Sequence, residues 1–193
     1  MNYYVVDTET NGLRAGWHEV SEFSIIRCSD RCQLTKNIKV EYPERTSVQA
    51  LQATNRTPSD LLRGNSKEEA VVAIEKFIQE DNLTPEHRVI ICHNTAFDRR
   101  FCHALWDSVG KIFPANCWLD TQSIYKNYAK LSLGIEKPKA TLEACLTTMN
   151  IKVRGQLHTA LSDSQNTYIL VEKLKKQGVD YIQYIKRVPH EKY

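Results

Sequence analysis

The stretch RVIICH, residues 88–93, holds four consecutive apolar residues between polar ones. A strand that meets a core on one face alternates apolar and polar residues, whereas a strand covered on both faces is apolar along its length. The stretch is therefore predicted to be a strand inside a sheet that helices cover on both sides.

The segments on both sides of this strand have helical spacing. Ser66 and Glu69 form a capping box, and apolar residues keep helical spacing from there to about residue 80. Residues 95–107 place an aromatic or leucine side chain at every fourth position. The other elements predicted in this half of the chain are a short strand that ends at Asp120 and helices over residues 142–149 and 160–176.

The beginning of the chain has the pattern of β structure. Residues 3–9 are predicted to form a strand, and residues 20–28 and 34–41 flank a polar turn as a hairpin. A hairpin followed by strands that alternate with helices indicates an α/β fold, with a mixed sheet of about five strands flanked by helices. The 193 residues contain no repeat or Gly/Ser linker, so we expect one domain, with a core over about residues 1–175 and a polar helical tail over about 176–193.

The composition is that of a soluble globular chain. Charged residues make up 25% and apolar residues 41%, and no stretch approaches the roughly 18 apolar residues of a membrane span. The start MNYYVVDTET has neither a basic leader nor an apolar signal core, which predicts a cytoplasmic protein with reduced cysteines. The net charge of +3 favours polyanions only weakly, and the basic residues between 173 and 192 fit either phosphate contacts or a solvated helix face.

The six cysteines include no Cys-x-x-Cys pair, the usual spacing of zinc knuckles and redox motifs. A rival interpretation is a zinc site made of Cys92, His93, Cys102 and His103. Adjacent residues on a strand point to opposite faces, so this quartet would need unusual geometry to become tetrahedral. Small buried thiols are the simpler interpretation.

Two acids follow the apolar start of the first strand in VVDTETNGL, residues 5–13. Asp7 and Glu9 are two residues apart, so both carboxylates lie on the same face of the strand at its end. Two like charges are tolerated there if the acids lie in water, if one stays protonated, or if a cation lies between them.

Two more acids and a histidine lie where they could join this pair. Asp163 falls on the apolar stripe of the last helix. Either its charge is stabilised by the helix dipole in the first turn, or the carboxylate faces the sheet and must be hydrogen-bonded, neutralised or bound to metal. Asp98 lies in the first turn of the helix after RVIICH, with Asn94 or Thr95 as cap. His158 precedes the last helix in a loop, and it is either a surface residue or, beside carboxylates, a general base.

Three segments in this order, DTETNGL (7–13), HNTAFDRRF (93–101) and HTALSD (158–163), resemble the three motifs of the DEDDh 3′–5′ exonucleases. All five motif residues are present at the usual separations. The resemblance covers residues 1 to about 175, and the layout is most similar to exonuclease X and to the proofreading subunit of bacterial replicative polymerase. It implies an RNase H-like fold and a metal-dependent hydrolase that releases nucleoside 5′-monophosphates from 3′ ends of DNA or RNA.

The resemblance also implies a role for each motif residue. Asp7, Glu9 and Asp163 would bind one Mg²⁺ or Mn²⁺ ion, Asp7 would bridge to a second ion, and Asp98 would support the second ion through water. His158 would take the proton. Two such cations can activate a water and stabilise the leaving 3′ oxygen of a phosphodiester. A partly open carboxylate cluster suits Mg²⁺ better than Ca²⁺ or Zn²⁺.

The same resemblance implies contacts to the terminal nucleotide. Thr8 and Thr10 would contact it, Leu13 and Phe97 would pack against its base, and Asn94 would line the pocket. Core packing is an equal alternative for Leu13 and Phe97, since Phe97 begins the apolar stripe of its own helix.

The chain departs from the family pattern at two places. Ser24 stands where many members have glycine, and ATNRT (53–57) replaces the common HGIT segment. Both places lie off the metal site, so they bear on the rim of the nucleotide pocket and on substrate preference.

The alternative function is a noncatalytic module that keeps the fold and binds nucleic acid or a polymerase. Such a module has no chemical need for a general base or for metal-binding acids, so the intact set of five residues favours the exonuclease. The expected partner is the 3′ end of a nucleic acid, most simply a single strand. A polymerase partner is implied by analogy alone.

Overall fold

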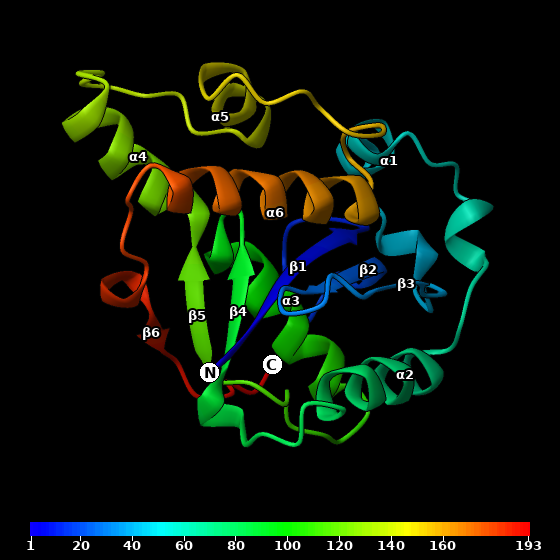
Figure 1. Ribbon diagram of the computed structural model, residues 1–193. Coiled ribbons are helices and arrows are strands. Elements are labelled where there is room, and N and C mark those ends of the chain that lie inside the picture. Colours follow the sequence, from blue (N-terminus) through cyan, green and yellow to red (C-terminus); the bar gives the residue numbers. More distant parts are fainter.

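Strand β4 (Arg88–Cys92) corresponds to RVIICH, and every one of its residues is buried. In the computed structural model, which describes residues 1–193, β4 lies inside a six-stranded sheet with the order β3-β2-β1-β4-β5-β6 (Figure 1). β1 (Asn2–Thr10) and β5 (Cys117–Asp120) both pair with β4 in parallel. The prediction of an internal strand covered on both faces is confirmed.

The outer parts of the sheet are antiparallel. β2 (Val20–Arg27) pairs with β1 and, as the predicted hairpin, with β3 (Gln33–Asn37). β3 ends before residue 41 because Ile38 bridges instead to Asn65. β6 (Lys186–Arg187) pairs with β5 at the opposite edge. The mixed α/β fold is confirmed, with six strands instead of about five, since β6 is too short to leave a sequence pattern.

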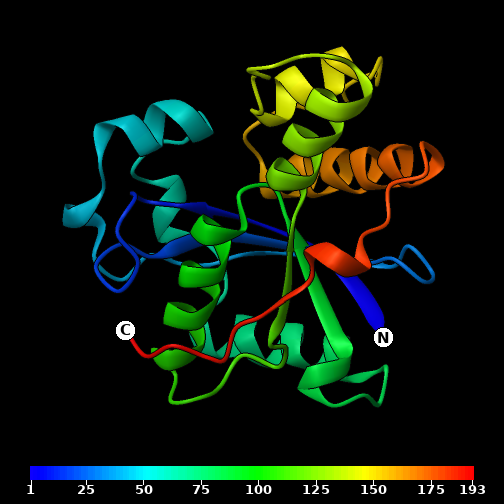
Figure 2. The same cartoon turned by 90° about the vertical axis from the view of Figure 1, so that its left-hand side faces the viewer.

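Helices cover the two faces of the sheet. α2 (Lys67–Gln79) and α3 (Thr95–Asp107) pack on one face. α4 (Thr121–Ser132), α5 (Leu142–Thr148) and α6 (Ala160–Lys176) pack on the other. Figure 2 shows α3 and α6 on opposite sides of the strands, so the three-layer arrangement expected from the sequence is present.

β1 contributes to both cores, since successive residues of a strand point to opposite faces. Tyr4 and Val6 are buried in the core beneath α2 and α3, and Val5 is buried in the core beneath α4, α5 and α6. Asp7 follows Val5 by two residues and therefore points toward the α6 side of the sheet.

Helices α2, α3, α5 and α6 match the predicted ones closely. The capping box of α2 is complete, because Ser66 Oγ accepts from Glu69 N (3.1 Å) and Glu69 Oε2 accepts from Ser66 N (2.9 Å). Two helices have no predicted counterpart, α1 (Val48–Thr54) and α4. α1 buries only Thr54, so it has no apolar stripe that a sequence pattern could reveal.

The segment after α6 is not the helical tail expected from the sequence. α6 ends at Lys176, and Gly178 has a left-handed backbone (φ 81°), as residues that follow a helix end often do. The chain then makes a 3-10 turn (Ile182–Tyr184) and β6, and its last residues run beside α3 (Figure 2). There the backbone N–H of Tyr193 donates to Asp107 Oδ2 (2.6 Å).

The six cysteines are all free thiols, and four of them are buried. The rival zinc quartet does not form. The His93 ring bonds to the Thr121 hydroxyl (2.9 Å) and to the Ala140 carbonyl (2.8 Å), while the His103 ring lies edge-on to Trp118. None of the helices combines the length and apolar character that crossing a membrane needs.

Candidate active site

The candidate site lies where β1 ends between α3 and α6. Asp7 and Glu9 are both partly buried on the α6 side of β1, as their spacing predicts. The next strand brings a third acid, because Glu22 of β2 lies directly opposite Glu9 in the antiparallel ladder. A change of register between Glu9 and Thr10 then ends the regular pairing.

The first turn of α6 supplies Asp163. Thr159 caps this helix by accepting from Ser162 N (3.2 Å), which fixes the start of α6 over the end of β1. One carboxylate oxygen from each of Asp7, Glu9 and Asp163 lies within 4.8 Å of the other two. The structure therefore brings together the three acids that the resemblance assigns to one metal ion.

The electrostatics of this cluster are unfavourable without a cation. Burial, followed by the charges of Asp98 and Glu9, holds the pKa of Asp7 well above its ordinary value. Burial, followed by the charges of Asp163 and Glu22, raises the pKa of Glu9 to about 8. Burial also raises the pKa of Asp163, although the N–H of its neighbour His158 lowers it.

Asp98 approaches the same strand end from the α3 side. It is 3% exposed, and its Oδ1 accepts from both Thr8 N (3.0 Å) and Thr8 Oγ1 (2.8 Å). Burial raises the pKa of Asp98 to about 7 even though the two bonds from Thr8 lower it. Asp98 is thus held against β1 at Thr8, the residue between Asp7 and Glu9, and it lies on the other side of the sheet from those two acids.

The cap of α3 is Asn94, one of the two predicted residues, but it does not cap through its side chain. Asn94 occupies the cap position with a left-handed backbone (φ 77°), and its side chain makes no capping bond. Instead, Asp120 at the end of β5 accepts from Asn94 N (3.0 Å) and Thr95 N (3.4 Å). A carboxylate from the neighbouring strand therefore fixes the helix that carries Asp98.

His158 lies in the loop before α6, as predicted, and is exposed. Its backbone is left-handed (φ 67°), an unusual conformation for a residue with a side chain, and its N–H donates to Asp163 Oδ2 (3.2 Å). The other oxygen of Asp163, Oδ1, is buried without a hydrogen-bond partner. The loop thus ties the histidine to a carboxylate that has one free oxygen.

The residues expected to contact a nucleotide lie around this cluster and differ in exposure and in hydrogen bonding. Leu13 is 76% exposed and outside the core, whereas Phe97 is partly buried and its ring centroid lies 4.8 Å from that of Phe101. The hydroxyls of Thr8 and Thr10 already donate within the protein, to Asp98 and to the Gly12 carbonyl (2.6 Å). Asn94 is exposed at the start of α3.

Sequence reasoning missed an ion pair behind the cluster. Arg56 Nη2 lies 2.8 Å from Glu22 Oε2, and the same oxygen accepts from Ala160 N (3.2 Å) at the start of α6. Arg56 also donates to the Ser21 carbonyl (3.2 Å). Glu22 thus links β2 to the helix that carries Asp163. An acid inside a buried strand was the available signal, but its partner is 34 residues away.

Ser24, the departure from the family's glycine, is fully buried against α6. Its Oγ lies 2.8 Å from Ser164 Oγ and accepts from Thr35 Oγ1 (3.2 Å). The extra hydroxyl is therefore satisfied by a serine on the facing helix, next in sequence to Asp163.

Comparison with known sequences gives two matches. The profile of the RNase T family, described as an exonuclease, matches residues 4–171. A PolC-type DNA polymerase III from Latilactobacillus sakei subsp. sakei (strain 23K) is 26% identical over 186 residues. The match covers 92% of this chain and 12% of the polymerase, so the chain spans a small part of that relative.

Solved structures share the fold. The nuclease domain of 3′hExo, a DEDDh family member bound to rAMP, superposes with a TM-score of 0.76 at 16% identity, over 97% of this chain and 96% of that one. A zinc-bound complex of E. coli ExoI with single-stranded DNA gives 0.77 at 17% identity, over 95% of this chain and 42% of that one. The profile match covers most of the sequence and includes all three acidic motifs. The chain therefore belongs to the RNase T exonuclease family.

Proposed function

We propose that this chain is a metal-dependent 3′–5′ exonuclease that hydrolyses phosphodiester bonds of DNA or RNA from the 3′ end and releases nucleoside 5′-monophosphates. The observation that carries the proposal is the meeting of Asp7, Glu9 and Asp163 within 4.8 Å, with Asp98 on the same strand end. Family membership supports the class of reaction, and the nucleotide and single-stranded DNA in the complexes of similar fold support the class of substrate.

The donor set fits a hard divalent cation. All the ligands are carboxylate oxygens, which Mg²⁺ and Mn²⁺ prefer, and the buried Oδ1 of Asp163 has no other partner. Asp7, Glu9 and Asp163 would hold one ion, Asp7 would also bind a second, and Asp98 would support the second through water. Such ions, when bound, supply an activated water and stabilise the leaving 3′ oxygen.

His158 is the proposed general base. Imidazole exchanges a proton near neutral pH, and a base must lie within hydrogen-bond reach of the attacking water. The side chain of His158 is exposed, and its backbone N–H donates to Asp163. This bond fixes the histidine beside the carboxylates. In this role an imidazole nitrogen would take the proton of the water as its oxygen attacks phosphorus.

The terminal nucleotide is proposed to lie between the β1–β2 loop and α3. Leu13 and Phe97 would contact its base, and Asn94 would line the pocket. Thr8 and Thr10 would contact the nucleotide as hydrogen-bond acceptors, because both hydroxyls and the N–H of Thr8 already donate to oxygens of the protein.

The test is degradation of matched single strands of DNA and RNA, labelled at the 5′ or at the 3′ end, with Mg²⁺, Mn²⁺ or EDTA. We expect 5′-labelled strands to shorten progressively, 3′-labelled strands to release a labelled mononucleotide at once, and EDTA to stop both. Asp7→Asn should abolish the reaction. The matched control, Glu136→Gln, removes an exposed acid in the segment between α4 and α5 and should cleave at the wild-type rate.

Two results would overturn the proposal. Cleavage that survives EDTA or Asp7→Asn would refute the metal-dependent mechanism. Binding of the strands without any cleavage would instead support the noncatalytic module.

A further inference from the structure

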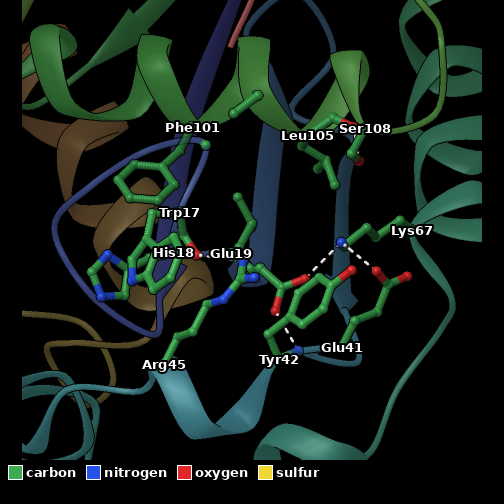
Figure 3. Close-up of a pocket in the computed structure, with 13 residues that line it drawn as sticks. Trp17, His18, Glu19, Glu41, Tyr42, Arg45, Lys67, Phe101, Leu105 and Ser108 are labelled. Carbon is green, nitrogen blue, oxygen red and sulfur yellow. Dashed lines mark hydrogen bonds and ion pairs between the residues drawn. The ribbon is translucent and has the colours of Figure 1, made fainter.

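A cavity of about 350 Å³ lies between α3 and the loop that joins β1 to β2 (Figure 3). α3 contributes Phe101 and Leu105 to one wall, and the opposite side is formed by the loop and the segment that follows β3. Lys67 lies at one end of the cavity. None of these side chains belongs to the carboxylate cluster.

Two aromatic rings and one cation form a stack at this cavity. The guanidinium carbon of Arg45 lies 4.1 Å from the centroid of the Trp17 ring and 3.9 Å from that of Tyr42. Trp17 is 47% exposed and Tyr42 is 43% exposed, so both rings also meet solvent. We call these three residues the Trp17–Arg45–Tyr42 stack. Cation–π contacts hold the two rings in place before any ligand binds.

The loop that carries Trp17 is fixed at its base. Asn11 N donates to the Glu19 carbonyl (3.0 Å), and Asn11 Oδ1 accepts from Glu19 N (2.7 Å). The Asn11 carbonyl also accepts from Ser47 N (2.9 Å), which ties the loop to the segment of Arg45. Gly12 leaves room for the His18 ring, since a Cβ at Gly12 would lie 2.2 Å from that ring.

Two ion pairs of the buried Lys67 fix the other side of the stack. Lys67 Nζ lies 2.6 Å from Glu19 Oε1 and 2.8 Å from Glu41 Oε2, and Glu19 Oε2 accepts from Tyr42 N (2.9 Å). The charge of Lys67 is therefore neutralised inside the protein. The side chain of Arg45 has no carboxylate partner and makes one hydrogen bond, to the Trp17 carbonyl (3.4 Å), so its charge is available to an anion.

The cavity adjoins the proposed active site. Phe101 in its wall follows Asp98 by three residues of α3, a rise of about 4.5 Å. The Phe101 ring also contacts Phe97. The loop of Trp17 carries Leu13 four residues earlier. Leu13 and Phe97, the proposed contacts of the terminal base, thus lie on the same loop and the same helix that line the cavity. The next nucleotides of the same strand can therefore reach the cavity.

We propose that the Trp17–Arg45–Tyr42 stack binds a nucleotide upstream of the 3′ end of a single strand, with a base stacked on Trp17 and a phosphate against Arg45. Exposed aromatic faces beside an arginine bind single strands without regard to sequence. A base inside a duplex has its faces covered by its neighbours, so the stack selects single-stranded substrate. This inference rests on the proposed function, because it assigns the path of the same substrate.

The first measurement is tryptophan fluorescence of Asp7→Asn protein titrated with a single-stranded DNA octamer. Trp106 and Trp118 are 0% and 2% exposed, so Trp17 is the exposed tryptophan whose emission a stacked base can quench. We expect saturable quenching, and we expect Trp17→Phe in the same background to abolish it. Quenching that persists in Trp17→Phe would overturn the proposal.

The second measurement is the affinity of the same octamer, labelled at its 5′ end, by anisotropy. Trp17→Ala should weaken binding at least about fivefold, and Trp17→Phe should keep most of it because a ring remains. Arg45→Gln should lower the slope of log affinity against log salt by about 0.7, the value for one phosphate of a single strand. Leu131→Ala changes a side chain of α4 that is 74% exposed and should alter neither quantity. Trp17→Ala affinity within twofold of the Asp7→Asn parent would refute the proposal.

The two proposals fail separately. If the wild type cleaves no strand but Trp17 is still quenched, the exonuclease proposal fails and the stack remains a binding site. If the wild type cleaves single strands and Trp17→Ala leaves both quenching and affinity unchanged, the stack proposal alone fails. Equal affinity for a blunt duplex octamer and the single strand would refute the selection of single strands.

Discussion

Replacing Glu9 by glutamine should stabilise the metal-free protein while abolishing its hydrolysis. Burial and the neighbouring acids Asp163 and Glu22 oppose the charge of Glu9 and raise its pKa from the ordinary 4.5 to about 8. Glutamine has nearly the same shape but no charge. The substitution therefore removes an unfavourable interaction of the fold together with a proposed metal ligand.

The magnitude follows from the linkage between pKa and stability. A rise of about 3.5 pKa units corresponds to about 5 kcal/mol of unfolding free energy lost once the pH exceeds both values. Glu9 is only partly buried, and Asp7 and Asp163 keep part of the repulsion when Glu9 is neutral. We therefore expect Glu9→Gln to gain about 2 kcal/mol at pH 8.5.

The sign of the pH dependence is fixed by the direction of the shift. A carboxyl whose pKa is raised in the folded protein costs nothing below its unfolded value, and the cost grows as the pH rises toward the folded value. The advantage of Glu9→Gln should therefore be small at pH 4.5 and largest above pH 8. Mg²⁺ should narrow the difference in unfolding free energy between Glu9→Gln and the wild type, since it stabilises the wild type by binding the folded state.

The assay is urea unfolding in EDTA at pH 5.0 and pH 8.5, repeated with Mg²⁺, alongside Glu136→Gln as a matched exposed control. The control should stay within about 0.5 kcal/mol of the wild type at both pH values. A Glu9→Gln protein that is less stable than the wild type in EDTA at pH 8.5 would refute the reasoning. It would mean that contacts within the protein already stabilise the charged Glu9, so that its carboxylate does not need a bound cation.

Three further predictions concern the base and two ion pairs. His158→Ala should lower kcat about 10²- to 10⁴-fold with KM changed little, measured by steady-state cleavage; a KM defect alone would exclude the role of base. Arg56→Ala should lower kcat/KM about tenfold and Arg56→Lys less, because Glu22 loses the partner that holds it at the start of α6. Unchanged cleavage would show that the Arg56–Glu22 ion pair does not support the active site. Arg88→Met should cost about 3 to 5 kcal/mol in urea unfolding, since Asp81 would stay buried without its cation; a loss under 1 kcal/mol would contradict this.

Local periodicity predicted the elements whose apolar residues face a core. β4 is apolar from Val89 to Cys92 and buried throughout, and the stripe of α3 includes Phe101 and Leu105, both buried. α4 was missed although Ile124, Tyr125 and Ala129, which it buries, keep helical spacing, because this stripe is short. β6 exists only through its pairing with β5, which no local pattern records.

The candidate site was predictable in its residues but not in its supports. The period of two in a strand places Asp7 and Glu9 together, and the family resemblance adds the acids of α3 and α6 and His158. The groups that hold these elements in place come from distant segments. Asp120 caps α3 from 26 residues away, and Glu22 reaches the start of α6 across 138 residues. Contacts of that separation are set by the packed fold, and one sequence gives no pattern for them.

The arrangement of the two helices shows why the fold alone does not neutralise the cluster. Asp98 is the fourth residue of α3 and Asp163 is the fourth residue of α6, so two helix N-termini face the end of β1 from opposite sides of the sheet. Each N-terminus stabilises a nearby carboxylate by about 0.3 to 1 kcal/mol. Burial and repulsion at Glu9 alone oppose its charge by up to about 5 kcal/mol. Two helix dipoles are therefore too weak to balance four acids, and the difference is what a bound divalent cation would supply.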